Sequence, residues 1–142
     1  MKYIAAFFLL IIFTGCTPAT RLTIFNNTTQ PLIISFLTLE ESISLQPNEF
    51  GTLYVQNGRK LRVQMNDDVW IYKKAKNDSF SRTIDLPKEY VNTGWPVDIL
   101  VQINQNRNLY ILLKNTNFPA DNLNVQPKGF PIAPYVKKIT NQ

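Results

Sequence analysis

The stretch KLRVQMNDDVWIYKK, residues 60–74, decides the fold class that this sequence predicts. In its first half, LRVQM, apolar and polar residues alternate, which is the two-residue period of a β-strand with one buried face. The turn-forming tripeptide NDD, at 66–68, then leads into a run rich in aromatic and β-branched residues, VWIYKK at 69–74. The stretch therefore predicts a β-hairpin.

Matching the apolar faces of the two strands sets the register that we expect for this hairpin. Val63 then lies opposite Ile71, and Met65 lies opposite Val69. The other face carries cations beside aromatic rings. Its residues are Lys60, Arg62, Trp70, Tyr72 and Lys74, and we name it the aromatic-basic face. Because cations pack on aromatic rings and Trp, Tyr and Arg are enriched at binding hot spots, this face is the candidate site for a protein partner or a glycan. In the alternative interpretation, the two rings lie under a loop or the C-terminal arm, and the cations lie around the margin of the sheet.

Working outward, short runs rich in branched aliphatic and aromatic residues recur at about ten-residue spacing, with Asn, Pro, Gly and Asp clusters between them. The segments that fit this pattern are 21–25, 32–39, 42–45, 50–55, 60–65, 69–74, 82–86, 95–103 and 109–114. No long stretch shows the 3.6-residue period of an amphipathic helix. The pattern predicts an all-β fold, an antiparallel β-sandwich of about 7–8 strands over residues 21–114.

Two further hairpins are expected within this domain. A three-residue loop, QNG at 56–58, would pair Leu53 with Leu61 and so keep the apolar side chains of both strands on one face. The glycine of that loop would take the left-handed position of a bulged turn. Segments 95–103 and 109–114 form the second hairpin, around the turn NQNRN.

The last segment, residues 115–142, departs from the strand pattern. Four prolines interrupt it, at Pro119, Pro127, Pro131 and Pro134. Proline rules out a long helix or a central strand, so we expect an extended Pro-rich arm that packs on the domain through Phe130, Ile132 and Tyr135. The alternative is that the Pro-x-x-Pro spacing within 129–138 serves as a polyproline ligand.

The N-terminus begins MKYIAAFFLLIIFTGC, in which one lysine precedes an uncharged run over residues 3–13. As a helix this run would measure about 16 Å, well short of the roughly 30 Å core of a bilayer. A short apolar run behind a positive charge is instead typical of a secretory signal peptide. The following residues, Phe13-Thr14-Gly15-Cys16, resemble the lipobox of bacterial lipoproteins, with small residues directly before a cysteine and phenylalanine where leucine is usual.

This resemblance covers the first 16 residues and implies how the chain is processed. Residues 1–15 would be removed as a signal peptide, and Cys16 would carry a covalent diacylglycerol and an N-acyl chain such as palmitate. Residues 16–20 would then form a lipidated tether that holds the domain at the membrane. Since Thr17 stands where an aspartate would favour the inner membrane, the resemblance implies the periplasmic face of the outer membrane.

Two other interpretations of the N-terminus stay open, a secretory peptide that is cut elsewhere and an uncleaved anchor. The chain has a single cysteine, which cannot form an intramolecular disulfide. Lipidation accounts for this odd cysteine, whereas cleavage elsewhere leaves a free thiol.

The composition excludes most catalytic chemistries. The chain has no histidine, which removes Ser-His-Asp and Cys-His catalysis and the commonest metal ligand. The adjacent carboxylates, Glu40-Glu41 and Asp67-Asp68, point to opposite faces of a strand or belong to a turn, so neither is an expected acid–base pair. The net charge of +5 comes from scattered basic residues and does not indicate nucleic-acid binding. We therefore expect no enzyme, no metal and no cofactor beyond the acyl chains.

The sequence thus predicts a non-catalytic, membrane-anchored envelope lipoprotein that acts as a protein-binding or assembly module. By analogy of size, anchor and fold, a transenvelope or secretion complex is one setting for such a module. The alternative is a periplasmic inhibitor or a glycan- or ligand-binding lipoprotein, although the positive charge disfavours steering to a basic target such as lysozyme. A hydrolase built on carboxylates is the third class.

Overall fold

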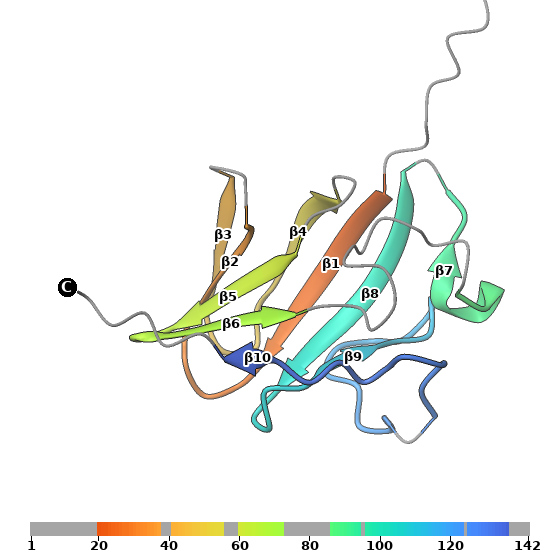
Figure 1. Ribbon diagram of the computed structural model, residues 1–142. Helices are drawn as coiled ribbons and strands as arrows, with labels where there is room; N and C mark the ends of the chain where they lie inside the picture. Colours follow the sequence, from red (N-terminus) through yellow and green to blue (C-terminus); the bar gives the residue numbers. More distant parts are fainter. Residues whose placement is uncertain are drawn as a thin grey trace, which may run out of the picture.

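The computed structural model has two β-sheets, and its regular secondary structure is almost entirely β-strand (Figure 1). It describes residues 20–37, 41–55, 60–72, 86–94, 96–123 and 125–136. Residues 1–19, which include Cys16 and the expected signal peptide, lie outside the described residues, as do Lys74 and residues 82–85 of an expected strand. Within the described ranges no helix is both long enough and apolar enough to cross a membrane.

The first sheet has two long strands at its centre (Figure 1). Its members are β1 (Thr20–Asn27), β4 (Phe50–Val55), β7 (Val91–Asn92), β8 (Val97–Asn104) and β9 (Leu109–Ile111). Their order is β4-β1-β8-β7, and β9 pairs with the later half of β8. β1 and β8 run parallel, whereas β4, β7 and β9 pair antiparallel with their neighbours. The expectation of a purely antiparallel fold is wrong at β1 and β8, because the long chain between them allows either direction.

The second sheet has the order β10-β6-β5-β2-β3, and its neighbouring strands are antiparallel. Its members are β2 (Leu32–Phe36), β3 (Ser42–Leu45), β5 (Leu61–Met65), β6 (Asp68–Tyr72) and β10 (Tyr135–Val136). β10 comes from the C-terminal arm, so the arm contributes an edge strand. The described residues form ten strands instead of the expected 7–8, because β7 and β10 are short pairings of two residues each.

The two sheets share one hydrophobic core. Leu22, Ile24 and Val101 face it from the first sheet, and Leu61 and Val63 face it from the second. Each of these side chains is at most 1% exposed. Because a fully buried aliphatic side chain contributes roughly 1.5–3 kcal/mol, the contact between the sheets is the main source of stability.

One of the two further hairpins is confirmed and the other is wrong. β8 and β9 form the expected antiparallel pair. Leu53 and Leu61 lie in different sheets, since Leu53 pairs with Leu22 and Leu61 pairs with Phe36. Both residues still face the shared core, so an alternating pattern cannot distinguish a hairpin from a connection that crosses between two sheets.

The register of the hairpin between β5 and β6 is shifted by one residue from the expectation. The strands are joined by a two-residue turn, Asn66-Asp67, in which Asn66 takes the left-handed φ of 53° that asparagine tolerates. Val63 therefore lies opposite Trp70 and not Ile71. A turn one residue shorter than the expected three moves every side chain of β6 to the other face of the sheet.

The C-terminal arm lies against both sheets in its described part. The side-chain amide of Gln102, in β8, accepts a hydrogen bond from the N–H of Ala120 (2.9 Å) and donates one to its carbonyl (3.3 Å). Ile132 exchanges two backbone hydrogen bonds with Leu109 in β9. The later part of the arm, dark blue in Figure 1, then pairs with β6 through β10. It therefore connects an edge of the first sheet to an edge of the second.

Candidate functional site

The structure places the residues of the expected aromatic-basic face in different surroundings. Trp70 and Tyr72 are fully buried and belong to the shared core. Arg62 lies on the outer face of the second sheet, and Lys60 is partly buried just before β5. Lys74 lies outside the described residues. The expectation that both rings share an exposed face with the cations is wrong, because the register shift turns the rings inward.

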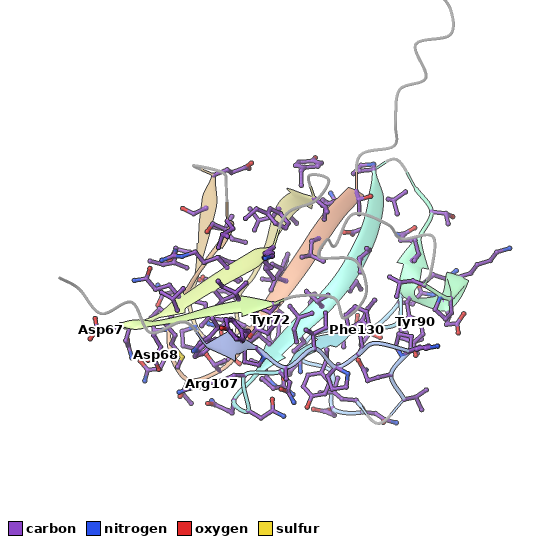
Figure 2. The ribbon with its side chains drawn as sticks, in the orientation of Figure 1. Asp67, Asp68, Tyr72, Tyr90, Arg107 and Phe130 are labelled. Atoms are coloured by element: carbon purple, nitrogen blue, oxygen red, sulfur yellow. The ribbon has the colours of Figure 1, made fainter. Side chains whose placement is uncertain are left out.

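A different basic residue, Arg107, contacts both buried aromatic side chains. The guanidinium carbon of Arg107, in the turn between β8 and β9, lies 4.7 Å from the centroid of the Trp70 ring. Arg107 also pairs with Asp68 at 3.5 Å, and its backbone carbonyl accepts a 2.7 Å hydrogen bond from the Tyr72 hydroxyl (Figure 2). Burial raises the pKa of Tyr72 above its ordinary value. We name this group the Arg107 clasp, and its contacts join the two sheets.

A pocket with a volume of about 300 Å³ lies where η2 (Lys88–Tyr90), the end of β9 and the arm meet. We name it the arm pocket. Its lining residues are Glu89, Tyr90, Ile111, Leu112, Leu113, Thr116, Ala120, Asn122, Val125 and Gln126. Figure 2 shows Tyr90 at the side of the molecule along which the arm runs.

Side-chain hydrogen bonds hold the arm in place as one wall of this pocket. The side-chain amide of Gln126 accepts from the N–H of Ile111 and donates to its carbonyl, both at 3.0 Å. This amide thus pairs with β9 as a neighbouring strand would. The hydroxyl of the buried Tyr90 donates to the carbonyl of Val125 at 3.4 Å. Removal of either contact would loosen the wall that the arm provides.

The arm pocket is suited to binding an apolar group. Leu113 is 50% exposed and Val125 is 78% exposed, and exposed apolar side chains beside a concave site are typical of contact surfaces. Of the lining residues only Glu89 and Tyr90 can titrate. One carboxylate does not by itself supply the acid and the base of a hydrolytic reaction. Among the described residues, no three His, Cys, Asp or Glu side chains group as ligands for a metal ion.

Sequence reasoning missed this pocket because it extended the last strand too far. The expected strand 109–114 places Leu113 on the inner face with Ile111. The strand ends at Ile111, after which Leu112 is buried and Leu113 turns to solvent. The polar run KNTN that follows Leu113 is the one sequence signal that the strand is ending.

Neither a scan of protein-family models nor searches of curated proteins and of solved structures found a match for this chain.

Proposed function

We propose that this protein is a non-catalytic envelope lipoprotein that is anchored through acylated Cys16 and binds another envelope protein. The anchor would lie on the periplasmic face of the bacterial outer membrane, and the partner would belong to an assembly such as a transenvelope or secretion complex. The lipobox resemblance supports the anchor. We interpret the two mostly antiparallel sheets as a β-sandwich on which the Pro-rich arm is docked as a binding element.

The exposed apolar rim of the arm pocket is the observation that carries the binding role. Leu113 and Val125 present apolar surface to water, and covering such surface contributes about 25 cal/mol per Å². The pocket volume of about 300 Å³ lies at the small end of the range for ligand sites. An apolar side chain on a segment of a partner protein therefore fits it better than a large ligand. The carboxylate of Glu89 would accept a hydrogen bond from that segment.

Site-specific photo-crosslinking in intact cells tests this binding role. Benzoylphenylalanine in place of Val125 should yield a crosslink to one envelope protein. The same probe in place of Ile33, which is 42% exposed in the second sheet, should not yield that product. Leu113→Asp, introduced beside the probe at position 125, should abolish the crosslink because it puts a charge on the apolar rim.

A crosslink that survives Leu113→Asp, or a probe at position 125 that yields no product, would contradict binding at the arm pocket. The anchor is tested separately by intact mass, which should show acyl chains on Cys16 and none on the Cys16→Ser variant. Inhibition of an added lysozyme, or binding of peptidoglycan fragments, by the purified protein would favour the alternative of an inhibitor or glycan-binding lipoprotein.

A further inference from the structure

We infer that one end of the molecule rests on the lipid bilayer to which Cys16 is anchored, and that this contact fixes the orientation of the domain. We name this end the β1 pole, and its described surface residues include Thr20, Arg21, Leu37, Tyr54 and Lys60. The inference rests on the acylation of Cys16 in the proposed function. Beyond the anchor itself, the inference identifies the surface of the domain that meets the membrane and the side chains that make the contact.

The tether leaves little room between the β1 pole and the membrane. Four peptide units separate Cys16 from Thr20, the first residue of β1. A fully extended chain spans at most about 3.6 Å per residue, so these units reach about 14 Å. The headgroup layer takes up several ångströms of that distance. The start of β1 must therefore lie at the membrane surface.

Strand pairing gathers further strand ends at this pole. Thr20 pairs with Val55 at the end of β4 and with Val97 at the start of β8. The short connection from Val55 to Leu61 brings the start of β5 to the same end of the molecule. Phe36, the last residue of β2, pairs with Leu61. In Figure 1 the end of β4 and the start of β8 lie at the top, where the chain enters β1. Both sheets therefore contribute surface to the β1 pole.

Two large side chains with apolar bodies are exposed on this surface. Tyr54 is 49% exposed and lies opposite Arg21 in the neighbouring strand. Leu37 is 45% exposed and donates its backbone N–H to the carbonyl of Lys60, so these two residues are neighbours. Tyrosine is enriched at membrane interfaces, where its ring enters the apolar layer and its hydroxyl stays hydrated. Lysine beside an apolar side chain can extend its amine to the headgroups.

Charges of both signs occur among the described residues of this pole. Arg21 donates to the carboxylate of Asp98 through two nitrogens, at 3.0 and 3.3 Å. The exposed Glu41 precedes β3, and Lys60 precedes β5. Because the opposite charges of these described residues offset one another, they add little attraction to anionic lipid. Contact with the bilayer should therefore depend on Tyr54 and Leu37 and vary only slightly with lipid charge.

Labelling at two positions of one strand tests this orientation. The acylated full-length mature protein is reconstituted into vesicles of phosphatidylethanolamine with a minor share of phosphatidylglycerol. An environment-sensitive fluorophore is attached to Tyr54→Cys, or to the matched control Phe50→Cys. Acylated Cys16 does not react with the label.

Phe50 is 64% exposed on the same face of β4, and four residues place it about 13 Å further from the pole. Lipids brominated near the headgroup should quench the label at position 54 severalfold more than the label at position 50.

Equal quenching at the two positions, or stronger quenching at position 50, would overturn the inference. Loss of the difference when phosphatidylglycerol is omitted would overturn it as well, since the contact would then depend on lipid charge. Intact mass is measured first on the same samples. A protein without acyl chains would refute the proposed anchor, whereas an acylated protein without the quenching difference would refute only the orientation. Thermal unfolding of both labelled variants confirms that each is folded.

Discussion

Tyr72 joins the second sheet to the turn after β8 through one hydroxyl group. The hydroxyl is buried, donates to the carbonyl of Arg107 at 2.7 Å, and has a pKa raised above the ordinary 10.0 by burial. The folded protein therefore keeps this phenol protonated at a pH at which the unfolded chain ionises it. The stability that follows from this difference is fully present below about pH 10 and falls as the pH rises above that value.

Tyr72→Phe should lower the free energy of unfolding at pH 7 by about 1–3 kcal/mol, because the partly buried carbonyl of Arg107 loses its donor. The same variant should lose less stability than the wild type between about pH 9.5 and 11. Urea unfolding across this pH range measures both effects. Tyr110→Phe is the control, since that hydroxyl accepts a hydrogen bond from Asn106 in an exposed setting. A wild-type alkaline slope that persists in Tyr72→Phe would contradict the assignment.

Gly51 lies where β4 of the first sheet approaches β3 of the second. A Cβ atom at this position would lie 2.8 Å from Leu45 Cδ2 and 3.0 Å from Ile43 Cδ1. Gly51→Val should therefore destabilise the protein by about 1–3 kcal/mol through overpacking. The double variant Gly51→Val with Leu45→Ala should recover part of the loss relative to the sum of the two single variants. If the loss of stability in the double variant, measured by urea unfolding, equals the sum of the two single losses, then the contact with Leu45 is not what restricts side-chain size at position 51.

At the scale of elements, the alternating pattern identifies the strands and their buried residues but not their partners. Leu53, Leu61 and Val63 were all expected on an apolar face, and all three face the core. The pairing of Leu53 with Leu61 was wrong because any two strands that face a shared core satisfy the same pattern. Trp70 lies on the core face and not on the expected solvent face, because the length of the turn at Asn66 decides the register and the sequence NDD is compatible with either length.

The same limit explains what was missed at the candidate site. The arm pocket depends on where β9 ends and on where the arm returns, and both are set by contacts between distant residues. Gln126 pairs with the backbone of Ile111 across a long stretch of chain, and no local pattern marks a glutamine for that role. The proline content did indicate an extended arm, because proline acts on the backbone of its own segment.

The pairing of Gln126 with β9 predicts that one side chain controls the docking of the arm. Gln126→Glu keeps the shape of the side chain but replaces the donating amide, so the carbonyl of Ile111 loses its donor and faces a carboxylate. We expect a loss of about 1–3 kcal/mol in the free energy of unfolding and faster proteolysis within the arm. Limited proteolysis with mass analysis locates the cleavage. The control is Lys128→Gln, at an exposed position of the arm, which should leave cleavage at neighbouring sites unchanged. Equal cleavage of the arm in both variants would exclude a role of Gln126 in docking the arm.

At the scale of the whole molecule, the arm closes one side of the two-sheet structure. Ile132 pairs with Leu109 at the edge of β9, and β10 pairs with the edge of β6. The other side is joined by the connection from β3 to β4, where the buried amide of Asn26 donates to the carbonyl of Leu45 at 3.1 Å. The sheets are thus linked by short chain on one side and by a segment distant in sequence on the other.

This asymmetry predicts the effect of removing the arm. Deletion of residues 129–142 takes away Ile132 and β10, so the edges of β9 and β6 lose the hydrogen-bond partners that these residues supply. Unpaired strand edges recruit other strands, so the truncated chain should form dimers or larger species and unfold at a lower urea concentration. Light scattering after size-exclusion chromatography of the soluble Cys16→Ser form measures the association. Deletion of residues 137–142 alone keeps both pairings and is the matched control. If the variant that lacks residues 129–142 stays monomeric and unfolds at the same urea concentration, the arm covers the strand edges without stabilising them. The arm pocket would then need another source of rigidity.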